Sequence, residues 1–254
     1  MMAQTNSKFF SVMVVGDNHK ELMDKYSFGL EVEPYVRYEY LKADKYQNNS
    51  IKALDNLLSN ADKVGLDTQL REGLERRIKA LKKMTPFEYY RELTDGMYYD
   101  EDGNALTTEN PDGHWATARI GKNFSLPLKL KDGTETYSAK ADDIDWWAMN
   151  EPTAMYEAAW EMVVDGREPT NAAEERVYES MKDKTTYFSN FKDKDDYVTY
   201  STSYWNYAFV DKNGWLDMTN EDEKKWITNF FERFVKNIDP NDTVTIYECT
   251  VNNG

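Results

Sequence analysis

Three aspartates beside two tryptophans form the group of residues best suited to chemistry. Asp142, Asp143 and Asp145 lead directly into Trp146 and Trp147. Carboxylates serve as general acids, bases or cation ligands, and an indole ring can stack on a sugar. The group therefore predicts an acidic, aromatic-lined binding site. The interpretation we favour is a helix entry or loop cluster, in which solvated carboxylates precede tryptophans that belong to the core.

Two further residues are candidates for the same site. Trp115 begins a run of alternating character over residues 115–120, and Arg119 lies within that run. A tryptophan face and a guanidinium group would give this site a stacking surface and a fixed positive charge.

Histidine and cysteine patterns exclude most other chemistry. His19 and His114 lack a Ser, Cys or Asp companion at a familiar spacing, so structural or surface roles are expected for both. The single cysteine, Cys249, cannot form an internal disulfide, and its apolar surroundings predict a buried, inert thiol.

Metal and cofactor motifs are also missing from the sequence. One cysteine and two distant histidines cannot build a tetrahedral zinc site. An EF-hand loop counted from Asp100 would need Gly and Glu where Ala105 and Pro111 stand. Gly16 has no further glycine nearby to form a phosphate-binding loop. We therefore expect no metal and no cofactor.

Charge limits the partners. The net charge of −15 disfavours nucleic-acid backbone and anionic lipid. The most basic stretch, residues 71–83, contains Glu72 and Glu75 and is best explained as a solvated helix face. Residues 1–7 are polar, and no apolar run is long enough to span a bilayer. These features predict a cytoplasmic protein without direct nucleic-acid or membrane binding.

The elements around the candidate residues predict an α+β fold. Residues 94–145 carry turn signals at Asp102-Gly103, Pro111-Asp112-Gly113 and Asp132-Gly133, between short apolar or alternating runs. This pattern is typical of a β-meander, which we place at the centre of an antiparallel or mixed sheet.

The N-terminal segment predicts a strand, a helix and a returning strand, over residues 9–15, 18–26 and 32–40. This order suggests a ferredoxin-like unit. We expect the late strand, residues 243–251, to share its sheet, with the helices of residues 50–93 packed on one face.

The remaining elements follow from caps and periodicity. Helices are predicted at residues 51–61, 67–81, 85–96, 152–166, 171–181 and 219–234, and a strand at 203–211 that turns at Asn213-Gly214. No linker is visible, so we expect one domain over residues 1–254, with a subdivision at 145/146 as the alternative.

The segment Thr108-Glu109-Asn110-Pro111-Asp112-Gly113-His114-Trp115, followed by Ile120-Gly121, resembles a motif of uncharacterised proteins from tailed bacteriophages and some bacteria. Residues 14–18 and 143–146 are also similar to that family. The second aromatic after Trp115 is missing here, and Lys122 follows Gly121 where the family has glycine. The resemblance implies a phage origin and an accessory role in infection, and it supplies no catalytic residues.

The favoured hypothesis is an acidic phage accessory protein that binds a host or phage protein, for example as an inhibitor of a host defence or nucleic-acid enzyme. Its carboxylates, including those of residues 193–196 and 221–223, could mimic nucleic acid. The alternatives are a carboxylate-dependent enzyme that uses the aspartate–tryptophan group, and a virion or assembly component. Oligomeric state and partner identity do not follow from the sequence.

Overall fold

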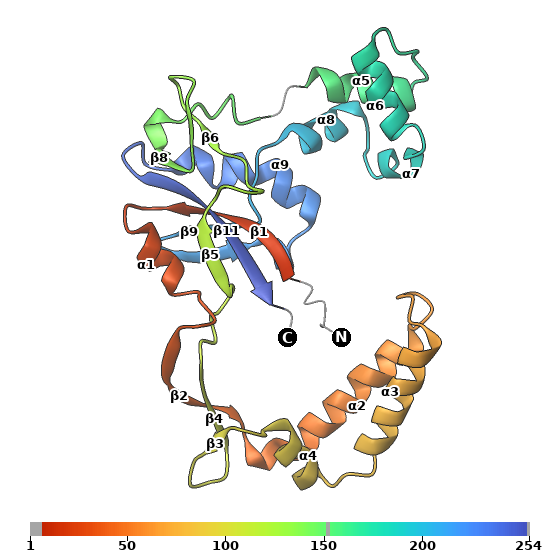
Figure 1. Ribbon diagram of the computed structural model, residues 1–254, viewed down its shortest axis with the longest axis vertical. Helices are drawn as coiled ribbons and strands as arrows, with labels where there is room; N and C mark the ends of the chain where they lie inside the picture. The colour runs from red at the N-terminus through yellow and green to blue at the C-terminus, as the bar shows by residue number, and fades with distance from the viewer. Residues whose placement is uncertain (1–6, 151–152, 253–254) are drawn as a thin grey trace. The chain divides into compact units, whose positions relative to one another are not determined.

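The computed structural model describes residues 7–150 and 153–252, and the fold is α+β (Figure 1). The chain forms two compact units. Unit 1 combines residues up to Leu30 with those from Pro111 onward, and unit 2 comprises residues 31–110. The boundaries between the units therefore fall at residues 30/31 and 110/111, away from the 145/146 subdivision considered above.

A mixed sheet organises unit 1. Its two long strands, β1 (Ser7–Val15) and β11 (Thr243–Asn252), pair antiparallel, with Phe10 opposite Cys249. β9 (Ala208–Asp211) runs parallel to β1, and β10 (Gly214–Asp217) pairs with β9. The prediction that the first and last strands share a sheet is confirmed.

Strand alternation gives this sheet two apolar faces. Met13 and Val15 pack in the cluster that holds Trp226 and Phe230 of α9 (Glu223–Arg233). Phe10, Val12 and Val14 pack in a second cluster with α1 (His19–Asp24). The prediction that the helices of residues 50–93 cover one face is wrong, because the aromatic stripe of α9 occupies it and those helices belong to unit 2.

The predicted central meander is divided among separate sheets. β5 (Thr117–Ile120) and β8 (Ser138–Lys140) share one side of β11, with η2 (Ala141–Asp143) following β8. β6 (Leu128–Lys129) and β7 (Glu135–Thr136) form a small hairpin of their own. The prediction that a meander forms the centre of the sheet is wrong. The long strand β11, near the end of the chain, pairs with strands that turn signals alone assign to their sequence neighbours.

Helices α5 (Ala154–Val163), α6 (Ala172–Met181), α7 (Thr185–Phe188) and α8 (Lys194–Thr202) follow in unit 1. Trp160, Phe188 and Tyr197 form their buried cluster. The predicted start at Pro152 lies outside the described residues. The predicted strand 203–211 is confirmed only from residue 208, because backbone groups before it bond outside the sheet: the amide of Tyr204 donates to the Asn150 side chain, and the carbonyl of Asn206 accepts from the Trp226 indole.

Two short helices and one cap complete unit 1. η3 (Met218–Asn220) precedes α9, and η4 (Val235–Asn237) follows it. The side chain of Asp222 accepts from the amide of Lys225 and starts α9. The predicted start at residue 219 or 220 is therefore wrong, since those residues belong to η3.

Unit 2 contains a three-stranded antiparallel sheet and a helical part. β2 (Glu31–Tyr38), β4 (Ala105–Glu109) and β3 (Tyr98–Tyr99) pair in that order. The ferredoxin-like prediction is wrong. β1 already pairs with β11 on one side and β9 on the other, so no free edge remains there for β2.

The helices of unit 2 follow β2 after the short η1 (Tyr40–Lys42): α2 (Ala43–Ser59), α3 (Thr68–Leu81) and α4 (Pro86–Leu93). The predicted caps Asp67 and Thr85 are confirmed, the latter as a capping box with Glu88. α2 starts at Ala43, before the predicted start at residue 51, and the hydroxyl of Ser50 bonds to that of Tyr89 at 2.6 Å. Within the described residues, no helix has the length and apolar character needed to cross a membrane.

Candidate functional site

Trp115 and Arg119 have structural partners in unit 1. The indole nitrogen of Trp115 donates to the carbonyl of Met23 at 3.2 Å, and the ring packs on the α1 face of the sheet. Arg119 is largely exposed, and its Nε lies 3.3 Å from a carboxylate oxygen of Glu248. Both residues therefore help to hold the sheet together.

The aspartates of the predicted group point to different neighbours. Asp142 is exposed and pairs with Lys131 at 3.2 Å. Asp143 is also exposed. Asp145 accepts a hydrogen bond from the amide of Ala148 at 3.0 Å, which closes a local turn. Five well-formed pockets of the described residues are lined by none of these three carboxylates.

The tryptophans of the group are also separated. Trp146 is half-buried and packs against the α9 face of the sheet, whereas Trp115 packs against the α1 face. Trp147 is 87% exposed. Since a sheet lies between Trp115 and Trp146, the predicted residues do not surround one substrate-sized space.

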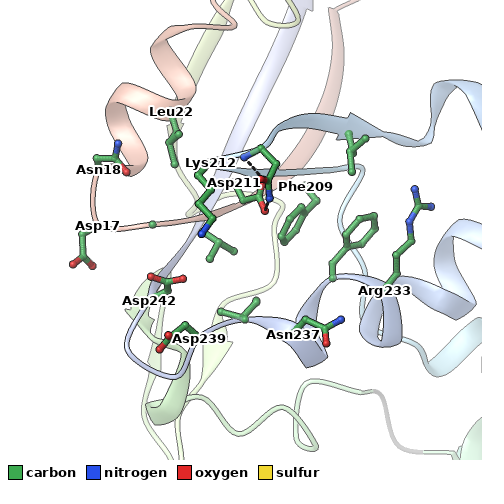
Figure 2. Close-up of a pocket in the computed structure, with 16 residues that line it drawn as sticks. Asp17, Asn18, Leu22, Phe209, Asp211, Lys212, Arg233, Asn237, Asp239 and Asp242 are labelled. Atoms are coloured by element: carbon green, nitrogen blue, oxygen red, sulfur yellow. Dashed lines mark hydrogen bonds between the residues drawn. The ribbon is translucent and has the colours of Figure 1, made fainter.

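A polar depression of about 800 Å³ lies where β1 and β9 end. Because the two strands are parallel, their carboxyl ends meet at one edge of the sheet, the usual place for a ligand in an open α/β sheet. Figure 2 shows Asp17, Asp211 and Lys212 at these ends, and Asp239 and Asp242 on the loop that follows η4.

Most of these carboxylates already have partners. Asp17 accepts from Lys140 at 2.7 Å, and this hydrogen bond lowers its pKa. Asp211 accepts from the backbone and side-chain nitrogens of Asn213, as the dashed lines in Figure 2 show, and Asp239 accepts from Asn241 in the same way. Lys212 extends into the depression toward Asp242.

The chemistry open to this depression is limited. Its lining contains carboxylates, amides, Lys212 and Arg233, and no hydroxyl, thiol or imidazole side chain. No group of three or more His, Cys, Asp or Glu in the described part of the chain is arranged to hold a metal ion. The depression suits a small polar ligand better than a nucleophile-dependent reaction.

The most unusual polar arrangement in unit 1 is the environment of Glu248, which sequence reasoning missed. Its side chain is 1% exposed. One carboxylate oxygen accepts from four successive amides, those of residues 122–125, at 2.7–3.0 Å, and also from the Ser125 hydroxyl. Burial alone would raise the pKa of Glu248, but the amides outweigh it and lower the pKa to about 2.

The loop fastened to Glu248 presents apolar side chains to solvent. Phe124 is 44% exposed and Leu126 is 53% exposed. The ring of Phe9, itself 61% exposed, meets that of Phe124 edge-on at 5.8 Å. We call Phe9, Phe124 and Leu126 the apolar patch.

One sequence signal pointed toward Glu248. Residues 243–251 alternate, and Val244 and Ile246 face the α9 side of the sheet, so Glu248 must face the same side. A charged residue at an inward strand position predicts a buried partner. Its partners are backbone amides, which no residue type reveals.

Cys249 matches its prediction, since it is fully buried and burial raises the pKa of its thiol to about 12.

Comparisons of the chain with protein-family models, curated proteins and solved structures give no match. Functional inference therefore rests on the geometry described above and on the sequence motifs.

Proposed function

We propose that this protein acts by binding another protein, and that the apolar patch is its principal contact surface. The observation that carries the proposal is the pairing of a rigid support with an exposed apolar face. A buried carboxylate, Glu248, fixes the backbone of residues 122–125, while Phe124 and Leu126 remain open to solvent.

The energetics of the apolar patch favour association. Burying a side chain such as Phe or Leu contributes roughly 1.5–3 kcal/mol relative to leaving it exposed. A loop that is already ordered loses little further conformational entropy when a partner covers it. Large apolar side chains on a fixed backbone are the usual anchors of an interface.

The resemblance to phage proteins supports a host protein as the partner and the host cytoplasm as the place of action. Inhibition of a host defence or nucleic-acid enzyme is the specific form that an accessory role would take. This part of the proposal rests on sequence motifs rather than on the geometry.

Nucleic-acid mimicry is a narrower form of the proposal with less support. It needs carboxylates that are exposed and free, yet several of those that suggested it have structural roles. Asp193 and Asp222 cap α8 and α9, Asp196 pairs with Lys224, and Glu221 pairs with Arg233. We therefore place the main contact on the apolar patch.

A capture experiment tests the proposal. The pure protein is used as bait in lysate of the expressing cell or, if it is phage-encoded, of the host. The double variant Phe124→Ser, Leu126→Ser should lose the captured protein, because both patch anchors are removed. Trp147→Ser is the matched control, since Trp147 is the most exposed tryptophan described and lies outside the patch.

Each outcome bears on a different hypothesis. Loss of capture only in the patch variant supports the proposal, and capture of nothing at micromolar concentration refutes it. Loss only in Trp147→Ser would move the site to the aspartate–tryptophan group. The enzyme alternative predicts instead that Asp142→Asn, Asp143→Asn and Asp145→Asn abolish an activity, and mass spectrometry of purified particles tests the virion alternative.

A further inference from the structure

The sheet of unit 2 has an incomplete edge. On one side, β4 pairs with β2 from Ala105 to Glu109. On the other side, β3 pairs only with Ala105 and Leu106. Among the described residues, no strand therefore lies beside residues 107–109 on the β3 side.

The incompleteness follows from how α4 ends. Gly96 adopts a φ of +79°, and the amide of Met97 donates to the carbonyl of Thr94 at 3.1 Å. This glycine-dependent turn directs the chain away from the helix, so that pairing with β4 begins only at Tyr98.

Thr108 is the residue of β4 whose backbone N–H and C=O face the side that β3 leaves uncovered. The amide of Asp100 donates to the carbonyl of Asn104 at 3.0 Å across the β3–β4 turn. Backbone groups of alternate residues face the same side of a strand, so Asn104, Leu106 and Thr108 direct theirs toward β3. The amide of Glu109 is already bonded to the Thr107 hydroxyl at 3.1 Å. Thr108 thus offers one donor and one acceptor to an additional strand.

An apolar depression of about 350 Å³ adjoins these groups. Pro34, Met97, Tyr98 and Leu106 supply its apolar lining, and Tyr98 is 83% exposed. A strand placed against Thr108 would direct alternate side chains toward this depression.

The surroundings of the depression are acidic. Glu33, Asp95 and Glu109 lie in it or next to its lining residues, and all three are exposed. Only Glu109 forms an ion pair within the described residues, with Arg37. An occupant with basic residues would be complementary in charge.

We propose that the free edge of β4 binds an extended peptide segment of a partner, rich in alternating β-branched apolar residues and flanked by lysine or arginine. The peptide adds a strand next to Thr108 and places one apolar side chain against Tyr98 and Met97. This site lies in unit 2 and does not depend on the apolar patch of unit 1.

The probe for this site is a blocked synthetic peptide of alternating valine and threonine with lysines at both ends, titrated into the full chain. We expect the Thr108 amide to gain protection from hydrogen exchange. Thr108→Pro removes the donor at an edge position that tolerates proline, and should weaken binding about tenfold. Thr108→Val keeps the amide and should bind as the original chain does.

A backbone N-methylated version of the peptide serves as a second test that leaves the protein unchanged, and it should not bind. The proposal is overturned if the lysine-flanked peptide leaves the Thr108 amide unprotected at millimolar concentration, if Thr108→Pro binds equally well, or if a glutamate-flanked peptide binds as tightly. These results come from a defined peptide, so they stand apart from the capture experiment.

Discussion

The amide of Phe124 donates to a carboxylate oxygen of Glu248 across 2.7 Å, although the two residues are 124 positions apart in the chain. Three neighbouring amides converge on the same oxygen. This relationship joins the last strand of the sheet to the loop that displays the apolar patch. The stability of the sheet and the shape of the proposed binding surface therefore depend on one side chain.

Replacing Glu248 should destabilise the protein strongly. Glu248→Ala leaves several buried amides without an acceptor, and we expect a loss of about 3–5 kcal/mol in the free energy of unfolding. Glu248→Gln keeps one acceptor oxygen, so its free energy of unfolding should fall by less. Urea denaturation followed by circular dichroism measures both values. A change below ~1 kcal/mol in Glu248→Ala would show that the amides find other partners.

The same contact predicts a pH dependence. The pKa of Glu248 falls from 4.5 to about 2 on folding. The carboxylate therefore contributes fully to the free energy of unfolding above pH 4.5, and this contribution is lost as the pH falls toward 2. The stability difference between the original protein and Glu248→Gln should shrink over that interval. A difference that stays constant from neutral pH to the acid limit would contradict the assigned protonation state.

Gly121 should resist even the smallest side chain. A Cβ atom there would overlap the Ser125 hydroxyl and would lie 2.9 Å from the Tyr137 ring. We expect Gly121→Ala to cost about 1–3 kcal/mol, measured by thermal and urea denaturation. Gly73→Ala in α3 is the control: nothing lies within 4 Å, and helix propensity predicts a gain of roughly 0.5–1 kcal/mol. Equal effects at both positions would rule out crowding as the cause.

The pKa of His114 should lie below its usual value of 6.5. Its ring stacks on Trp215 at 4.5 Å, and burial lowers its pKa despite the opposing charges of Asp217 and Asp112. The unfolded chain then takes up this proton at a higher pH than the folded one, so stability falls as the pH drops below 6.5. NMR titration should give a midpoint below 6.5, and Asp217→Asn should lower it further. A midpoint above 6.5 would mean that the charge of Asp217 outweighs burial.

Local signals in the sequence were sufficient for several elements. Asp67 and Thr85 cap helices as expected because a cap depends on the few residues that follow it. The strands of residues 9–15 and 243–251 were identifiable because their apolar runs are long and rich in β-branched residues.

Strand partners were less predictable, since pairing depends on which edges remain free once the whole chain has folded. β2 has the composition expected of a neighbour of β1 and yet pairs with β4. The candidate site shows the same limit. Trp115 and Trp146 seemed suited to one site, but they lie on opposite faces of the sheet.

The most direct test of the binding proposal is the hydrogen-exchange footprint that a captured partner leaves on this chain. We predict protection of residues 121–127 together with the segment around Phe9, because Phe9 and Phe124 form one exposed surface. A footprint confined to the depression at Asp211 and Asp242, or to the residues around Trp147, would contradict the account.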